Sequence, residues 1–348
     1  MNLTRRSILR SFSAAGALAA ARAQSPAAVT AKTVYGQVRG ASYDGVLVFK
    51  GIPYAGSPAA EGRFKPAPKL KPWTGVRDAL LYGAQSIQPP DPNWPKEWKP
   101  AIAGEDCLFL NVWTPRVDHA ARPVMFYSHG GGFATGNGGA DVAPQDTMHD
   151  GAALARDYDV VVVTHNHRLG IMGYLYLGDL LGEEYAASGV AGMLDIASAL
   201  AWVSGNIGEF GGDPGRVMIW GESGGGAKTT TLTAMPRAQG LYQRASIESG
   251  SMLRLKTRES AAATTRAILK ALDLSDKDAR QLLTVPADRL TAAQAGLPRT
   301  RPTGGFPSVT SGMADGLGFG PMVDGHEIPA NPYDPVAPAM SAKIPMIV

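Results

Sequence analysis

A serine flanked by glycines is the residue in this sequence best placed for chemistry: Ser223, within Gly-Glu-Ser-Gly-Gly at residues 221–225. The preceding Val-Met-Ile-Trp run predicts a short buried strand. A G-x-S-x-G motif between a strand and a helix forms a tight, strained turn, and its small residues let the two elements approach. The turn places the hydroxyl at a helix N-terminus, where an oxyanion is stabilised. We predict that Ser223 is a nucleophile and that Glu222, beside it, tunes the local field without acting as a base.

A glycine-rich segment upstream supports this prediction. Ser-His-Gly-Gly-Gly-Phe at residues 128–133 follows the apolar run 124–128, as an oxyanion loop does. Glycines leave backbone N–H groups free to point at a developing negative charge. We assign a predicted oxyanion hole to the N–H groups of Gly131, Gly132 and Gly224. Taken alone, the segment could be a simple turn, but its position upstream of the serine motif favours the oxyanion loop.

These residues need a layered scaffold to position them. Continuous apolar runs predict strands buried on both faces, at residues 108–113, 124–128, 160–164 and 217–220. Alternating strands and helices indicate an α/β domain with a central sheet. The remaining predictions are short strands at 34–38 and 46–49, helices at 193–203, 258–272 and 276–283, and a Gly/Pro-rich loop at 301–320. Prolines between 53 and 100 disfavour long helices there.

Composition excludes several classes of protein. The 348 residues carry a net charge of +3, with 45% hydrophobic and 18% charged residues, which fits a globular chain. No block of Lys and Arg predicts a nucleic-acid surface. Cys107 is the single cysteine, so no intramolecular disulfide is possible. No metal-ligand spacing and no phosphate-binding glycine fingerprint occurs, so we expect neither a metal nor a cofactor.

The first 23 residues resemble a twin-arginine export signal. Arg5 and Arg6 precede the apolar, alanine-rich stretch 14–21, and Ala-Arg-Ala at 21–23 suits a signal peptidase. The apolar stretch is too short to span a bilayer permanently. We therefore expect an exported protein, periplasmic or secreted, whose mature domain covers residues 24–348. A disordered cationic tail is the alternative.

Two long motifs make the chain resemble the type-B carboxylesterase family, which includes bacterial para-nitrobenzyl esterases and is related to the cholinesterases. The stretch 210–225 resembles the serine signature of that family, and Glu-Asp-Cys-Leu-Phe-Leu-Asn-Val-Trp-Thr-Pro at 105–115 resembles its second signature. The likeness runs from about Val34 to the last residue. Shorter matches lie at residues 49–55, 62–64, 166–170 and 323–325.

The resemblance implies an α/β-hydrolase fold, with a central, mostly parallel sheet flanked by helices and incomplete at the C-terminal end. It implies hydrolysis of small-molecule carboxylic esters through an acyl-enzyme on Ser223, without a cofactor. Two positions differ from the family. Ser86 stands where a cysteine often pairs with Cys107, so we expect Cys107 to be a buried small hydrophobe. Gly224 stands where alanine is usual, which adds backbone freedom at the turn.

The resemblance also implies that the triad acid and histidine follow a strand like 344–348, in the order serine, acid, histidine. We therefore expect both beyond Val348, with little ester turnover and an exposed apolar edge in a chain ending there. His326 is the one histidine after Ser223, and it precedes the expected acid. For the others we expect a loop, structural or solvated role: His129 in the oxyanion loop, His165 and His167 structural, His119 and His149 solvated.

Two alternatives remain open at this level. Relatives that serve as binding proteins keep the fold, although such relatives usually lose the nucleophile, which is intact here as Ser223. A lipase or an amidase on the same scaffold would differ only in the lining of its pocket, and the fold does not separate these activities.

Overall fold

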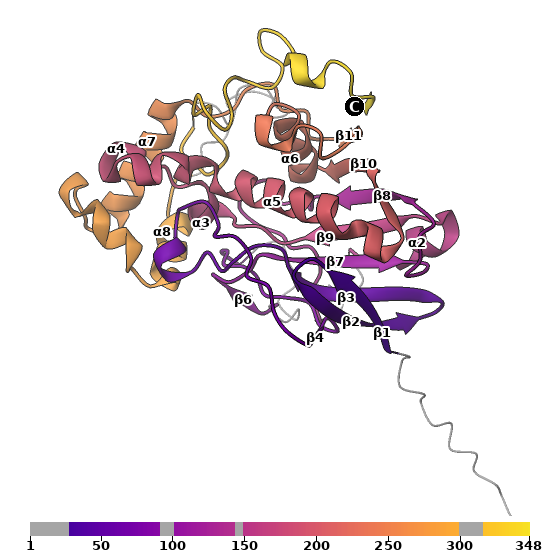
Figure 1. The fold of residues 1–348 in the computed structure, drawn as a ribbon. Coiled ribbons are helices and arrows are strands. Elements are labelled where there is room, and N and C mark those ends of the chain that lie inside the picture. The colour runs from indigo at the N-terminus through magenta and orange to yellow at the C-terminus, as the bar shows by residue number, and fades with distance from the viewer. Residues whose placement is uncertain (1–27, 91–100, 143–148, 299–315) are drawn as a thin grey trace, which may run out of the picture.

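A mixed β-sheet forms the centre of the computed structural model (Figure 1). The structure describes residues 28–90, 101–142, 149–298 and 316–348. The predicted export signal at residues 1–23 and most of the predicted loop at 301–320 lie outside the described residues. Within the described residues, ten strands join in the order β1-β2-β3-β7-β9-β8-β10-β11-β12, with β4 beside β2. They are β1 (Ala28–Thr33), β2 (Gly36–Tyr43), β3 (Val46–Pro53), β4 (Val76–Asp78), β7 (Phe109–Thr114), β8 (Arg122–Tyr127), β9 (Val161–His165), β10 (Gly212–Glu222), β11 (Arg244–Glu248) and β12 (Met346–Ile347).

The sheet is divided by strand direction. Neighbours from β1 through β9 in this order pair antiparallel, whereas β9, β8, β10, β11 and β12 pair parallel. The predicted parallel arrangement thus describes the half that carries Ser223. Sequence patterns did not predict β11, because its residues Arg-Ala-Ser-Ile-Glu are too polar at both ends to form an apolar run. A small separate pair, β5 (Gln85–Ser86) and β6 (Ala103–Gly104), lies outside this sheet.

Helices cover both faces of the sheet. They are α2 (Ala152–Tyr158), α3 (Gly170–Tyr174), α4 (Gly178–Leu181), α5 (Ala191–Asn206), α6 (Gly224–Leu232), α7 (Arg258–Ala271) and α8 (Ala287–Ala295). The 3-10 segments are η1 (Ala60–Gly62), η2 (Glu183–Val190), η3 (Ile207–Phe210), η4 (Pro236–Ala238), η5 (Asp276–Leu283) and η6 (Ala339–Ser341). The helices predicted at 193–203 and 258–272 correspond to α5 and α7. The one predicted at 276–283 is the 3-10 helix η5.

The apolar run of β9 shows why this strand is buried on both faces. Val161 and Val163 belong to the main core with α5, while Val162 packs on the other face with Ala155 of α2. Successive side chains of a strand point to opposite faces, so a strand covered on both sides favours apolar residues at successive positions. The continuous run in the sequence has this cause.

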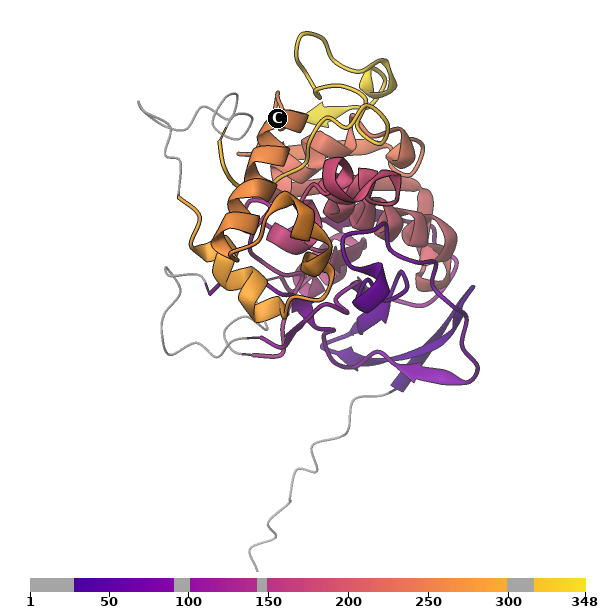
Figure 2. The same ribbon diagram turned by 90° about the vertical axis from the view of Figure 1, so that its left-hand side faces the viewer.

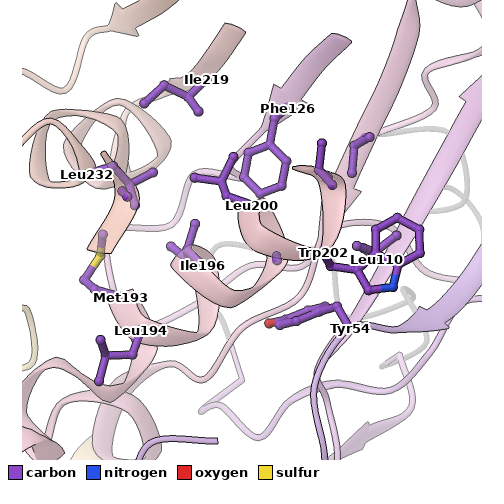
Figure 3. Packing of buried hydrophobic residues seen from close by; sticks show 14 of the residues in the cluster. Tyr54, Leu110, Phe126, Met193, Leu194, Ile196, Leu200, Trp202, Ile219 and Leu232 are labelled. Atoms are coloured by element: carbon purple, nitrogen blue, oxygen red, sulfur yellow. The ribbon is translucent and has the colours of Figure 1, made fainter. Parts of the chain in front are cut away.

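The main core lies between α5 and the parallel strands. Figure 3 shows Leu200 of α5 against Phe126 of β8, with Ile196 and Ile219 nearby. All four side chains are fully buried. Among the described residues, the stretch Glu183–Phe210 is long and apolar enough to cross a membrane, but 78% of its apolar window is buried inside the protein, as in the core helix of a globular domain.

A second apolar cluster includes side chains of α7, α8 and η5. These helices lie at the end of the molecule that faces the viewer in Figure 2.

A buried ion pair ties the loop after β9 to α5. The guanidinium of Arg168 donates to both carboxylate oxygens of Asp195, at 2.7 Å each, and both side chains are buried. The pair fixes the backbone that follows β9, because the Arg168 N–H also donates to Asp195 at 3.1 Å.

Cys107 is fully buried, which confirms the expectation of a small hydrophobe. Burial raises the pKa of its thiol, so the thiolate is disfavoured. The hydroxyl of Ser86 contacts the thiol and accepts a hydrogen bond from the Leu169 N–H at 3.0 Å. Ser86 thus occupies the place beside Cys107 that the family resemblance gives to a cysteine.

Candidate active site

The serine turn has the strained geometry that its motif predicts. Ser223 lies between β10 and α6 with φ 55° and ψ −118°, a conformation that residues other than glycine rarely adopt. Two backbone hydrogen bonds hold it. The Ser223 N–H donates to the Glu248 carbonyl of β11 at 2.8 Å, and the Ser223 carbonyl accepts from Ala227 N–H at 3.0 Å. The side chain is exposed at the carboxyl edge of the parallel strands.

The flanking glycines are required by close packing. A Cβ on Gly221 would lie 2.5 Å from the Ser128 carbonyl oxygen and 2.6 Å from the backbone of Gly225. A Cβ on Gly225 would lie 2.0 Å from the same Ser128 oxygen. The predicted approach of strand and helix is therefore present, and the structure adds a third element, the end of β8.

The predicted oxyanion loop begins where β8 ends. Ser128 N–H donates to the Trp220 carbonyl at 2.9 Å, which continues the pairing of β8 with β10. Gly131 and Gly132 have φ of 85° and 60°, so both need the freedom of glycine. The Gly131 carbonyl accepts from the N–H of Thr135 at 3.1 Å, which closes the loop into a turn.

The three N–H groups predicted for the oxyanion hole lie together. A Cβ on Gly224 would be 2.2 Å from the Gly132 nitrogen, so the two backbones touch. Within the described part of the chain, none of the N–H groups of Gly131, Gly132 and Gly224 donates a hydrogen bond. The sequence predicted only backbone freedom at Gly224; the structure shows that a Cβ at this position would require the loop to shift.

Glu222 is exposed and faces the base of this loop. Its carboxylate oxygen Oε2 would lie 3.7 Å from a Cβ on Gly130. Across the sheet Glu222 is in register with Glu248 of β11. Burial, and then these two carboxylates, raise the pKa of Tyr127, which places their negative charge at the carboxyl edge of β8 and β10.

Three histidines form a buried cluster behind the oxyanion loop. The ring of His167 stacks on His129 at 4.8 Å between centroids and lies 5.2 Å from His165. We expected a structural role for both His165 and His167, but only His165 makes a side-chain hydrogen bond within the described residues. His165 Nε2 lies 3.2 Å from Ser128 Oγ, but neither ring nitrogen of His167 has a partner among the described residues. Burial lowers the pKa of all three, so they are neutral.

The remaining histidines lie elsewhere. His119 is exposed as expected. The expectation that His149 is solvated was wrong: it packs 5.5 Å from the Tyr127 ring, and burial lowers its pKa to about 4. His326 is 88% exposed, with Nδ1 3.7 Å from Glu327. No described side chain forms a hydrogen bond with the hydroxyl of Ser223, and no described group of three His, Cys, Asp or Glu could hold a metal.

One buried residue of the site was missed by sequence reasoning. Lys228 of α6 is fully buried, and its Nζ donates to the His129 carbonyl at 2.7 Å. A signal was present, because Lys228 stands four residues after Gly224 and therefore lies on the same face of the predicted helix. A lysine within a run of Gly, Ala and Thr suggests an exposed position, and only the packing of the structure shows that Lys228 is buried.

Comparisons with known proteins identify the family of this chain. The family model described as "Carboxylesterase family" matches residues 25–348. The para-nitrobenzyl esterase of Bacillus subtilis (strain 168) is 37% identical over 91% of this chain and 61% of its own length. The phenmedipham hydrolase of Pseudarthrobacter oxydans is 35% identical, over 88% of this chain and 58% of its own.

Among solved structures, a carboxylesterase of Geobacillus stearothermophilus superposes with a TM-score of 0.77 at 38% identity, covering 91% of this chain and 60% of the other. This likeness confirms the predicted α/β-hydrolase fold. The chain spans about three-fifths of the length of these relatives. With its family signatures and fold both matched, the chain belongs to the carboxylesterase family.

Proposed function

We propose that this protein hydrolyses small-molecule carboxylic esters, with Ser223 as the nucleophile. The observation that carries the proposal is the contact between Gly132 and Gly224. It brings three N–H groups that donate no hydrogen bond to any described residue beside the strained serine turn. Membership of a family whose relatives are named as esterases supports the same reaction. The fumonisin B1 esterase of Sphingopyxis macrogoltabida, 33% identical, is a further relative named so.

The reaction proceeds in two acyl-transfer steps. Ser223 Oγ attacks the ester carbonyl and its proton passes to a base, while the N–H groups of Gly131, Gly132 and Gly224 bind the oxyanion. The alcohol leaves with a proton, and an acyl-enzyme remains. Water then attacks the acyl carbon, and the carboxylic acid is released. One oxyanion donor of this kind contributes about 3 kcal/mol to the barrier reduction.

The base and its orienting acid belong to the same proposal. The described histidines are buried, half-buried or exposed, and none of them forms a hydrogen bond with the hydroxyl of Ser223. The relatives are longer than the region that this chain matches. We propose that the counterpart of their remaining length supplies the acid and the histidine, in the order found in α/β-hydrolases. Losing the partner of a catalytic serine costs up to about 10⁶ in rate, so residues 1–348 alone should turn over esters slowly.

A fluorophosphonate probe and a para-nitrophenyl ester test this function. A product that extends past Val348 should hydrolyse the ester and react with the fluorophosphonate probe. The Ser223→Ala substitution in that product should remove one covalent label. Residues 1–348 alone should hydrolyse the ester far more slowly. Failure of the extended product to label or to hydrolyse any ester would favour a binding protein. Hydrolysis by residues 1–348 at the rate of the extended product would contradict the placement of the base.

Export is a separate part of the proposal. We infer a twin-arginine signal from Arg5, Arg6 and the Ala-Arg-Ala at 21–23, all of which lie outside the described residues. Replacing Arg5 and Arg6 with lysine should keep the protein in the cytoplasm with its signal uncleaved. N-terminal sequencing of the exported protein should begin at Gln24; a cytoplasmic, uncleaved native protein would contradict this.

A further inference from the structure

Lys228 is a buried cation without a carboxylate partner. Its side chain is fully buried on α6, and among the described residues no Asp or Glu forms an ion pair with it. Arg168, another deeply buried cation, is paired with Asp195 through two hydrogen bonds. Burying an unpaired charge is costly, so a lysine kept in this place calls for an explanation.

Among the residues that the structure describes, Lys228 makes one hydrogen bond, and it goes to the oxyanion loop. Its Nζ donates to the His129 carbonyl at 2.7 Å, and that carbonyl shares a peptide group with the Gly130 N–H. The Lys228 hydrogen bond therefore orients the first peptide of the glycine segment. Gly131 and Gly132 have no side chains to anchor them, so the orientation of the loop depends on contacts made by its backbone and its ends.

One face of the first half of α6 contacts this loop. Gly224, Gly225 and Lys228 lie on that face, since residues three and four apart on a helix are neighbours. A Cβ on Gly224 would touch Gly132, and one on Gly225 would lie 3.2 Å from the His129 oxygen. Lys228 adds the polar contact one turn further along. The two glycines permit the close approach, and the lysine adds a directional hydrogen bond from its side chain to the loop.

We propose that Lys228 is a positioning residue that fixes the oxyanion loop to the helix of the nucleophile through the His129 carbonyl. It touches no reacting atom. Its effect on rate rests on the proposed ester hydrolysis, whereas its effect on the geometry of the loop does not.

Within the described ranges, the surroundings of Lys228 add no opposing charge. The titratable groups that face it are His129 in the loop after β8, His165 of β9, His167 after β9 and His149 before α2. All four histidines have lowered pKa values, first through burial and next through Lys228 itself. Burial alone lowers the pKa of Lys228 to about 7. Burying the charged amine of Lys228 therefore destabilises the folded protein. In our proposal this cost is offset by the positioning of the oxyanion loop.

Hydrogen exchange measured by mass spectrometry tests the position directly. The variants are Lys228→Met, which removes the donor; Lys228→Gln, which keeps a neutral donor; and Thr229→Val as the matched control. Thr229 is fully buried on the same helix, and its hydroxyl has no partner among the described residues. We expect Lys228→Met to speed exchange in peptides covering residues 129–136 by at least about tenfold. Lys228→Gln should lie between it and the wild type.

Kinetics on a para-nitrophenyl ester give the second measurement, made on the longest product of the gene. Lys228→Met should lower kcat about ten- to a hundredfold, as expected for a misplaced catalytic group, with KM changed less than about twofold. The same variant should be no less stable to heat than the wild type, because an unpaired buried charge has been removed. A residue that merely supports the fold would lower stability and leave kcat of the folded fraction unchanged.

The two failures are distinguishable. Wild-type exchange over residues 129–136 in Lys228→Met would overturn the positioning role, whatever the activity. So would an equal effect of Thr229→Val. If the wild-type protein hydrolyses no ester, the proposed function fails, while the exchange comparison still decides the role of Lys228.

Discussion

Gly224 and Gly132 touch through their backbones: a Cβ on Gly224 would lie 2.2 Å from the Gly132 nitrogen and 2.5 Å from its Cα. One residue begins the helix after the nucleophile and the other lies in the loop after β8. Backbone atoms cannot yield as a flexible side chain can. The spacing between these two glycines therefore sets the width of the proposed oxyanion hole.

Gly224→Ala should displace the loop and lower kcat by about tenfold or more, since it moves one or more oxyanion donors. Steady-state hydrolysis of a para-nitrophenyl ester measures the effect. Gly205→Ala is the control, because Gly205 lies on α5 with no atom within 4 Å of an added Cβ. That variant should keep wild-type kinetics. Unchanged kcat in Gly224→Ala would show that the loop has room to move without harm.

The backbone strain at Ser223 predicts an unusual order of stability. Ser223→Gly should be more stable than Ser223→Ala by about 1–2 kcal/mol, because glycine adopts φ 55° and ψ −118° without strain. Urea unfolding of both inactive variants measures the difference. At Ser204, inside α5, the order should reverse, with glycine about 1 kcal/mol less stable than alanine. The same order at both positions would contradict strain in the turn.

Lys228 predicts a pH dependence of stability. The folded protein releases this proton at a pKa of about 7, below the ordinary value of 10.5. Between these values the unfolded chain binds more protons, so the contribution of Lys228 to the free energy of unfolding rises with pH. Below about pH 7 the cost of the buried charge is complete and constant. At about 1.4 kcal/mol for each pKa unit, the full change is about 5 kcal/mol.

Denaturant unfolding between pH 6 and pH 10 checks this dependence. The stability of Lys228→Met minus that of the wild type should be largest near pH 6 and should shrink as the pH rises. Thr229→Val should follow the wild-type profile in parallel. A constant difference for Lys228→Met across this range would mean that Lys228 does not titrate there.

The buried pair of Arg168 and Asp195 predicts a large loss of stability. Asp195→Asn leaves the guanidinium buried without a counter-charge and should cost about 3–5 kcal/mol. Equilibrium unfolding measures this cost. The comparison is Glu184→Gln, which breaks the exposed pair with Lys65 and should change stability little. Similar losses in the two variants would show that burial of the first pair does not govern its contribution.

Local patterns were sufficient for the elements that carry the site. The apolar runs at 124–128, 160–164 and 217–220 became β8, β9 and the end of β10. A strand buried on both faces has a continuous apolar run in its own sequence, so each of these strands can be recognised without knowledge of its neighbours. β11 was not found because only its middle residues are buried. The strained turn at Ser223 was also predicted, because glycine spacing restricts the backbone of immediate neighbours.

The environments of single polar side chains were harder to predict. His149 looks solvated in a polar stretch, yet it packs against Tyr127. Lys228 looks exposed within a run of small residues, yet it is fully buried. Neither burial has a local signature, because the covering groups come from other elements of the sheet. The prediction that His119 is solvated was confirmed, because the exposure of a loop residue does not depend on a distant partner.

The sequence by itself determined the serine turn, the glycine loop, the family and the parallel strands that support them. These depend on dihedral restrictions and hydrophobic periodicity, which act between residues close along the chain. Only the tertiary structure decided that Gly132 meets Gly224 and that Lys228 bonds to the His129 carbonyl. Contacts of this kind depend on how β8 and β10 pair and how α6 packs on them, and packing joins residues that no local pattern relates.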